Sequence, residues 1–263
     1  MDTIYQVLAE IQKSNDSAAF CVVTKSEGST PRHTGSKMLV YPDGHFIGTV
    51  GGGDLEHRVI EEARAALIDG ETRLLHYNLS EPSRGDPGVC GGQVEVFVEP
   101  ILPPAAVVVI GVGHVGKAVA HLAKWLGYRV VVSDDRPEYC NSENIPEADA
   151  FCVCPMAELP NQVSINPRTY IILTTRGSAV DVEGLPSLLN TNAGYIGVIG
   201  SKRRWATTVK ELNARGVSPE KIAFVHSPIG IELQAETPHE ISVSILAEIM
   251  MIRAKTTGNK LPV

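Results

Sequence analysis

Hydrophobic positions in the first part of the chain follow helical spacing at the start and extended spacing afterwards. Ile4, Val7, Leu8 and Ile11 recur every three or four residues, which predicts a helix. A second helix is predicted at 55–67. Apolar or alternating runs predict strands at 18–24, 37–41, 45–50, 73–79 and 93–99, with a hairpin turn at Asp43-Gly44. Together these elements predict a mixed α/β unit.

The pattern changes after residue 104 to short, continuous apolar runs separated by helical segments. Strands are predicted at 107–110, 129–133, 150–154, 170–174 and 195–199. Helices are predicted at 115–126, 182–189, 202–215 and 239–252. Strands that are apolar throughout and alternate with helices indicate a parallel sheet covered on both faces. The fold class predicted for the chain is therefore α/β, with a doubly wound parallel sheet in its second part.

A proline-rich segment separates the two parts. Three of the five residues from Pro100 to Pro104 are proline, and such a segment cannot continue a helix or a central strand. We therefore predict an N-terminal domain of residues 1–102 and a second domain of residues 103–263, which includes a C-terminal helix.

Composition and charge narrow the class of protein. Apolar residues make up 43% and charged residues 20% of the 263 residues, which provides hydrophobic cores without widespread disorder. The net charge of −7 disfavours general nucleic-acid binding, and the one visible basic cluster is Lys202-Arg-Arg204. No apolar run approaches the length of a membrane span, and the N-terminus lacks signal-peptide features. We therefore predict a cytoplasmic protein without a membrane span.

A glycine-rich loop follows the first predicted strand of the second domain. Gly111, Gly113 and Gly116 form a GxGxxG motif between four branched apolar residues and a helix, which is the context of a Rossmann βαβ unit. This loop (residues 111–116, the glycine loop below) and the helix N-terminus behind it favour an anion such as a phosphate. Asp134 and Asp135 end the next strand, where a carboxylate can bond a ribose hydroxyl and favour NAD over NADP. The alternative is a structural turn that holds no ligand.

Three loops of the first domain are richer in glycine than folding requires. They are Gly28-Ser-Thr-Pro-Arg32, Gly51-Gly-Gly53 and Cys90-Gly-Gly92. Consecutive glycines leave backbone amides open to a ligand, and Arg32 can clamp a phosphate or an oxyanion with two hydrogen bonds. Cys90 can contact a soft metal or a sulfur species as a thiolate. Two alternatives stay open: turn geometry for the glycines, and a small packed residue for Cys90.

The remaining reactive side chains carry weaker indications. The five cysteines are an odd, scattered set, which does not indicate a disulfide framework. Cys152 and Cys154 lie two apart on a predicted strand with no His or other Cys near them in sequence to complete a metal site, which favours core packing. His114 lies inside the glycine loop, where a loop residue is more common than a catalyst.

These stretches together resemble the XdhC/CoxI family, which are accessory proteins of molybdenum hydroxylases. The first domain carries the resemblance in its three loops, which extend to Gly51-Gly-Gly-Asp-Leu-Glu56 and Cys90-Gly-Gly-Gln-Val-Glu-Val-Phe-Val-Glu-Pro100. The second carries it in the glycine loop, Asp134-Asp-Arg-Pro137, Thr175-Arg-Gly177 and Tyr195-Ile-Gly-Val-Ile-Gly-Ser-Lys-Arg203. The most specific stretch begins with Ser227-Pro-Ile-Gly-Ile and ends with Ala247-Glu248. Each motif alone is weak, but their number and order cover most of the chain.

The resemblance implies an N-terminal XdhC domain, a Rossmann domain and a chaperone function. Such a chaperone binds molybdenum cofactor, as molybdopterin or its cytidine dinucleotide form, and supports its sulfuration. It then inserts the cofactor into the apo-enzyme of a molybdenum hydroxylase that acts on xanthine, aldehydes or carbon monoxide. The implied partners are that apo-enzyme, a cysteine desulfurase and a second copy of the chain, with no nucleic acid. Whether the chain turns over a substrate of its own stays open.

The family resemblance also assigns roles to the loop residues. We expect the cofactor to lie between the two domains, with its anionic tail on one glycine loop and its metal near Cys90. If the chain has chemistry of its own, the candidate catalytic residues are Cys90, Arg32 and Glu56. The residues expected to bind the cofactor are Ser29, Thr30, Arg32, Gly51, Gly52, Gly53, Cys90, Gly91, Gly92, Gly111, Gly113, His114, Gly116, Asp134, Lys202 and Arg203.

Two positions depart from the family pattern. Many relatives carry Cys where this chain has Asp54, so Cys90 is the only cysteine left in the motifs. If the family needs two thiols, this chain is impaired or uses Asp54 as an oxygen ligand. Some relatives carry His at the position of Ser178.

Two other functions remain open. An NAD(P)-dependent oxidoreductase would need a proton donor, and the only candidates near predicted strand ends are His114 and His226. An assembly adaptor would have a vestigial nucleotide site, with the helix predicted at 239–252 as its partner or dimer face. That helix equally fits a role as cover for the core. Titration with NADH and NADPH separates the oxidoreductase from the chaperone.

Overall fold

The structure, a computed structural model, describes residues 3–14, 16–79 and 91–256. The chain divides into two compact units, one of residues 1–103 with 253–263 and the other of residues 104–252. Each unit has its own sheet and its own hydrophobic core. Within the described ranges, no helix is both long enough and apolar enough to cross a membrane.

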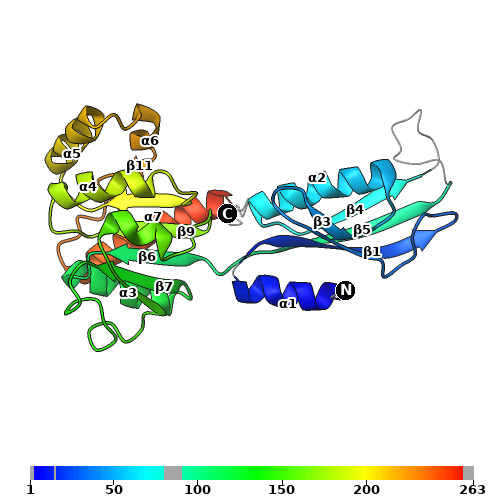
Figure 1. The fold of residues 1–263 in the computed structure, drawn as a ribbon, viewed down its shortest axis with the longest axis horizontal. Coiled ribbons are helices and arrows are strands. Elements are labelled where there is room, and N and C mark those ends of the chain that lie inside the picture. Colours follow the sequence, from blue (N-terminus) through cyan, green and yellow to red (C-terminus); the bar gives the residue numbers. More distant parts are fainter. Residues whose placement is uncertain (1–2, 15, 80–90, 257–263) are drawn as a thin grey trace. The chain divides into compact units, whose positions relative to one another are not determined.

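The first unit is built on a five-stranded antiparallel sheet in the order β3-β2-β1-β5-β4 (Figure 1). The strands are β1 (Ala18–Glu27), β2 (Lys37–Val40), β3 (Phe46–Gly48), β4 (Arg73–Asn78) and β5 (Gln93–Ile101). In β5, fully buried positions alternate with more exposed ones, because successive side chains point to opposite faces.

Two helices cover opposite faces of this sheet. The apolar stripe of α2 (Gly53–Asp69), from Leu55 to Ala66, packs in one cluster with Ala19 of β1. Helix α1 (Ile4–Ser14) packs Ile11 in a second cluster with Ala18. Since Ala18 and Ala19 are neighbours on a strand, the two clusters lie on opposite faces.

The second unit is built on a six-stranded parallel sheet in the order β11-β10-β9-β6-β7-β8 (Figure 1). The strands are β6 (Ala106–Ile110), β7 (Arg129–Asp134), β8 (Ala150–Val153), β9 (Thr169–Leu173), β10 (Tyr195–Val198) and β11 (Val225–His226). Every residue of β6 and of β9 is buried. Numbered from β6, the spatial order is 3-2-1-4-5-6 read from β8, which is the order of the doubly wound dinucleotide-binding fold.

Both faces of the parallel sheet are covered. Val107 and Val109 of β6 belong to one core cluster, with residues of α3 (His114–Trp125) and α7 (Pro238–Thr256). Val108 and Ile110 belong to the other. That second cluster takes its cover from α4 (Ser178–Leu188), α5 (Lys202–Ala214), α6 (Pro219–Ala223) and the 3-10 helix η2 (Met156–Asn161).

The predicted α/β fold class is confirmed, including the doubly wound parallel sheet. The helix predicted at 182–189 begins earlier, at Ser178. The short elements η2, α6 and β11 were not predicted, because runs of two to six residues carry too little periodicity to be recognised.

Candidate binding site at the carboxyl edge of the parallel sheet

A cavity of about 510 Å³ lies at the carboxyl edge of the parallel sheet, entirely within the second unit. From β6 the chain proceeds to β7 and β8 on one side, and from β9 it proceeds to β10 and β11 on the other. Ligands of open α/β sheets bind in the crevice at such a switch point. The cavity is lined by residues that follow β6, β7, β8 and β9, and its volume is typical of small-molecule sites.

The glycine loop forms one wall of this cavity. Gly111 has a φ of +91°, and a Cβ on it would lie 2.8 Å from the carbonyl oxygen of Thr174. A Cβ on Gly116 would lie 2.3 Å from the carbonyl oxygen of Gly111. By contrast, a Cβ on Gly113 would meet nothing within 4 Å. Gly111 and Gly116 therefore serve close packing, whereas Gly113 leaves its backbone open, and Gly113 and His114 line the cavity.

Asp134, which ends β7, binds the protein's own backbone and side chains. Its carboxylate accepts hydrogen bonds from the backbone amide of Val112 at 2.9 Å and from Nε and Nη2 of Arg136 at 2.8 and 3.0 Å. The hydrogen bond to Asp134 raises the pKa of Arg136, whose guanidinium lies 4.0 Å from the centre of the Tyr139 ring. Asp134 itself is only 4% exposed. Its role toward a ribose stays a prediction.

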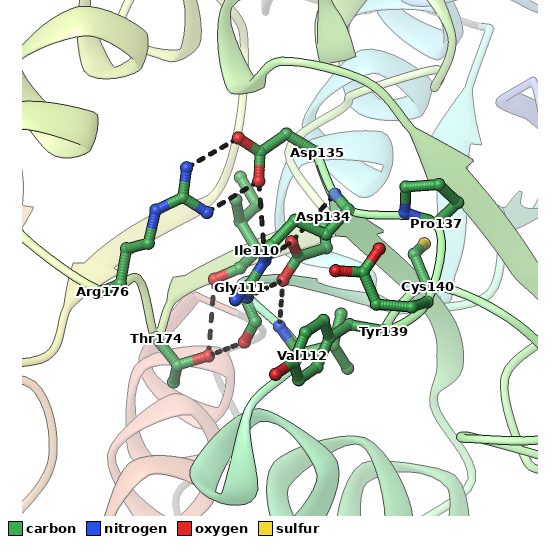
Figure 2. A network of polar contacts seen from close by, with 12 residues as sticks. Ile110, Gly111, Val112, Asp134, Asp135, Pro137, Tyr139, Cys140, Thr174 and Arg176 are labelled. Carbon is green, nitrogen blue, oxygen red and sulfur yellow. Dashed lines mark hydrogen bonds and ion pairs between the residues drawn. The ribbon is translucent and has the colours of Figure 1, made fainter.

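Asp135 forms the neighbouring ion pair with Arg176, the second residue after Thr174 at the end of β9 (Figure 2). The two guanidinium nitrogens donate to the two carboxylate oxygens at 2.8 and 2.7 Å. These hydrogen bonds lower the pKa of Asp135 to about 2 and raise the pKa of Arg176. The pair spans the ends of β7 and β9, the two strands that flank β6, and both residues line the cavity.

A third charged pair lies behind the cavity wall and was not anticipated from the sequence. Nη2 of Arg204 donates to Asp181 at 2.6 Å and to the hydroxyl of Thr175 at 2.9 Å. That hydroxyl in turn donates to the other oxygen of Asp181. Asp181 is fully buried and Thr175 is 8% exposed. The network ties α5 to the start of α4 and to the turn after β9.

The basic residues expected to bind the cofactor from α5 lie elsewhere. Lys202 and Arg203 are exposed in the first turn of that helix, and neither lines the cavity. Arg204, the next residue, points inward with Thr208 and Leu212, which are both fully buried. The spacing of these three residues is that of a buried helix stripe, and it is the sequence signal that identifies Arg204.

Cysteine enters the cavity from an unexpected position. Cys154, directly after β8, lines the cavity, and burial raises the pKa of its thiol. Cys152 and Cys154 both belong to the hydrophobic core, as predicted. Cys90, the predicted molybdenum contact, lies outside the described residues. In the described ranges no group of three or more His, Cys, Asp or Glu is arranged to hold a metal ion.

The three predicted loops of the first unit meet one another. A Cβ on Gly92 would lie 2.4 Å from the carbonyl oxygen of Ser29, and a Cβ on Gly51 would lie 2.9 Å from the ring of Pro31. The chain therefore needs glycine at both contacts. Between these loops the Thr30 hydroxyl lies 2.6 Å from that of Ser26, and Arg32 is exposed.

Glu56 anchors one of these loops. Its carboxylate accepts hydrogen bonds from the hydroxyl of Thr49 at 2.5 Å and from the amide of Val50 at 3.3 Å, directly before the glycines 51–53. Asp54, which replaces the family cysteine, is exposed and pairs with Arg58 at 3.0 Å. The described contacts of Glu56 hold the loop in place.

The most specific stretch of the sequence resemblance is held together by Glu248 of α7. Its carboxylate accepts from the Tyr195 hydroxyl at 2.8 Å and the Gly230 amide at 2.5 Å, and it lies 2.8 Å from Nδ1 of His226. Burial raises the pKa of Tyr195. Glu248 thus fixes the segment after β11 to α7 and to β10, which gives that stretch a structural role.

Two family models match the chain in succession. The XdhC and CoxI family model matches residues 11–78, and the model of the XdhC Rossmann domain matches residues 107–249. A crystal structure of a protein from Bacillus halodurans, described as a xanthine dehydrogenase, has the same fold. It covers 97% of both chains, with a TM-score of 0.52 and 22% identity.

Three curated proteins are similar in sequence. Uncharacterized protein YqeB of Escherichia coli K12 is 34% identical over 97% of this chain and 47% of its own length. A probable subunit of xanthine dehydrogenase from Bacillus subtilis 168 is 30% identical over 61% of this chain and 46% of its own. The molybdenum cofactor insertion chaperone PaoD of Escherichia coli K12 is 21% identical over 95% of this chain and 88% of its own.

The chain spans about half the length of the first two of these relatives. The predicted resemblance is confirmed by both family models, and the Rossmann-domain model alone matches more than half of the 263 residues. The protein therefore belongs to the XdhC and CoxI family.

Proposed function

We propose that this protein is a molybdenum cofactor chaperone. It binds the cofactor, supports its sulfuration and delivers it to the apo-enzyme of a molybdenum hydroxylase. The observation that carries the proposal is the cavity beside the glycine loop in the family's Rossmann domain. The similarity to PaoD supports it, because that relative is described as a molybdenum cofactor insertion chaperone.

The chemistry of the cavity suits the anionic end of the cofactor. Molybdenum cofactor carries a phosphate or a nucleotide diphosphate on its pterin. The amides in the first turn of α3 have no acceptor within the helix, and the positive end of the helix dipole favours an anion. Gly113 leaves that turn accessible. We assign Gly111, Gly113, His114 and Gly116 to the wall that holds the anionic tail.

The first unit provides the second part of the proposed binding surface. Its loops at 28–32, 51–53 and 91–92 are joined by close backbone contacts, and Arg32 is exposed beside them. An arginine can hold a phosphate or an oxyanion bidentately. We assign Arg32 and these glycine amides to cofactor contacts, and Cys90 to a contact with molybdenum or its sulfur ligand.

The test follows the cofactor from binding to delivery. Purified protein is incubated with isolated cofactor, passed over a sizing column and assayed for molybdenum and pterin. The loaded protein is then mixed with a hydroxylase apo-enzyme, with and without a cysteine desulfurase, and the recovered activity is measured. We expect co-elution of the cofactor, and recovery of activity that increases with the desulfurase. A chain that neither retains the cofactor nor restores activity contradicts the proposal.

Variants separate the two binding surfaces. Arg32→Ala and Cys90→Ser test the first unit, and Arg64→Ala, an exposed arginine that bonds only the Pro42 carbonyl in the described contacts, is the matched control. We expect weaker cofactor retention in the first two variants and none of that loss in the control. If both test variants retain the cofactor as well as the parent, the assignment to the first unit is wrong.

An NAD(P)-dependent oxidoreductase is the second candidate, because the strand order and the switch-point cavity are those of dinucleotide-binding enzymes. His114 lines the cavity and is the available proton donor. Reduction or oxidation of a substrate that depends on NADH or NADPH would favour this function over the chaperone.

A further inference from the structure

The two aspartates at the end of β7 are equipped for different tasks. Asp134 is 4% exposed, and both of its carboxylate oxygens accept hydrogen bonds from Val112 or Arg136. It cannot bind a ligand without releasing the glycine loop. The side chain of Asp135 is 43% exposed and its close partner is Arg176, with Nε of Arg136 farther away at 3.8 Å. Asp135 is therefore the carboxylate of this dipeptide that a ligand can engage.

The pair of Asp135 and Arg176 also lies where a ligand must approach. It connects the ends of β7 and β9 and so crosses the end of β6, where the glycine loop begins, and Figure 2 shows it beside Gly111. The side chain of Arg176 is 51% exposed. Because exposed ion pairs contribute little to stability, this one opens readily when better partners arrive.

We propose that the cavity binds a ribonucleoside diphosphate by splitting this ion pair. Arg176 leaves Asp135 and donates its two parallel hydrogen bonds to phosphate oxygens beside the glycine loop. The freed carboxylate of Asp135 then accepts hydrogen bonds from the 2′ and 3′ hydroxyls of the ribose. A guanidinium fork fits a phosphate as well as a carboxylate, so both charged groups exchange partners without being left unpaired.

The other groups of the cavity fit the same ligand. Its charged lining consists of Asp134, Asp135 and Glu183 with Arg136 and Arg176. Such a mixture of acceptors and cations suits a ligand that has hydroxyl donors as well as phosphates, and it suits a purely anionic ligand less well. Apolar side chains, among them Met156 and Val180, form a wall for the base.

This inference deepens the proposed function, since it names the nucleotide tail as the part of the cofactor that the Rossmann unit recognises. The same chemistry occurs in free nucleoside diphosphates, in NAD and in a cytidine dinucleotide cofactor. Free nucleotides therefore test the site without molybdenum. A failure of cofactor delivery would leave a positive nucleotide result standing, and a failure of nucleotide binding would leave delivery to be judged by its own assay.

The test is calorimetric titration of the purified chain with ADP, 2′-deoxy-ADP, CDP and NAD⁺. We expect 2′-deoxy-ADP to bind about tenfold more weakly than ADP, because it lacks one hydrogen bond to a charged carboxylate. Preference for CDP identifies the cytidine tail as the natural ligand, and preference for NAD⁺ identifies a nicotinamide dinucleotide. Absence of binding for all four ligands, or equal binding of ADP and its deoxy analogue, overturns the proposal.

Two variants test the exchange of partners directly. Arg176→Gln should weaken ADP binding by at least about tenfold, since the phosphates lose a bidentate partner. Asp135→Asn should abolish the preference for ADP over 2′-deoxy-ADP and strengthen the binding of inorganic pyrophosphate, because Arg176 is no longer neutralised. Arg64→Gln, on the first unit, is the control and should bind as the parent does. Urea unfolding of each variant establishes that it is folded, and parent-like binding by both test variants overturns the proposal.

Discussion

Two arginine–aspartate pairs lie at the carboxyl edge of the same parallel sheet, one buried and one exposed. Arg204 meets the fully buried Asp181 at 2.6 Å, and the hydroxyl of Thr175 completes the network. Arg176 meets Asp135 at 2.7 Å, but half of its side chain and 43% of that of Asp135 are exposed to solvent. Thr175 and Arg176 are consecutive residues, so one turn after β9 contributes to both pairs.

The difference shows how one edge of a sheet combines rigidity with ligand exchange. Removing one partner of a buried pair leaves a charge without solvent or counter-ion, so the network of Asp181 has one stable arrangement. An exposed pair is compensated by water when it opens. The buried pair therefore holds the strand ends in place, and the exposed pair is available for a ligand.

The largest effect is expected from Arg204→Met, which leaves the Asp181 carboxylate buried without its cation. We expect this variant to lose about 3–5 kcal/mol in the free energy of unfolding, measured by urea titration at pH 7. The double variant Arg204→Met/Asp181→Leu should recover most of that loss, because no unpaired charge remains. A single variant within about 1 kcal/mol of the parent would mean that Asp181 reaches solvent or takes up a proton.

The next effect tests whether the buried contacts extend to the glycine loop. Gly116→Ala places a methyl group 2.3 Å from the Gly111 carbonyl oxygen and 2.9 Å from the Thr174 hydroxyl. Overpacking of this kind costs about 1–3 kcal/mol in the free energy of unfolding, and the displaced loop should also lose nucleotide binding. Gly113→Ala is the matched control: its φ is −77° and its Cβ would meet nothing within 4 Å, so its stability should be close to that of the parent.

Asp134 is intermediate between the two pairs, being buried while its partner Arg136 is one-third exposed. Asp134→Asn retains an acceptor for the Val112 amide but loses the charge opposite Arg136. We expect a loss of about 1–2 kcal/mol in the free energy of unfolding, smaller than for Arg204→Met. A loss as large as that of Arg204→Met would remove the distinction between the three aspartates.

The sequence predicted the elements whose side-chain pattern is continuous over several residues. Continuous burial of β6 and β9 followed from unbroken apolar runs, and alternation in β5 followed from its mixed pattern. The glycine loop was identified by its position between strand and helix. The contact of Gly92 with Ser29 was not identified, because close approach between distant loops depends on tertiary packing.

The roles of adjacent charged residues were harder to predict. Nothing in the dipeptide Asp134-Asp135 tells which carboxylate turns toward the glycine loop, because strand alternation ends where β7 ends. In the basic cluster, Lys202 and Arg203 were selected, although the stripe of Arg204, Thr208 and Leu212 was visible as a helical repeat. A partner for that stripe could not be recognised from the sequence, since Asp181 lies on another helix and is joined to Arg204 only by the fold.

The smallest effect is expected from Asp135→Asn. Because the pair is exposed, we expect a loss of less than about 1 kcal/mol in the free energy of unfolding at pH 7. Arg176 lowers the pKa of Asp135 from 3.8 to about 2, so folding favours the ionised carboxylate. This contribution is complete above a pH of about 4 and is lost as the pH falls toward about 2. The difference between parent and variant should therefore disappear over that range.

Salt provides the decisive contrast between the two pairs. At about 1 M salt, charges at the surface are screened within roughly 3 Å, so the small difference between parent and Asp135→Asn should vanish. The loss caused by Arg204→Met should persist, because Asp181 has no contact with the electrolyte. A loss above about 2 kcal/mol for Asp135→Asn that resists salt would make its pair a structural one. An ion pair of that strength would not open for a nucleotide, and the proposed exchange of partners would lose its physical basis.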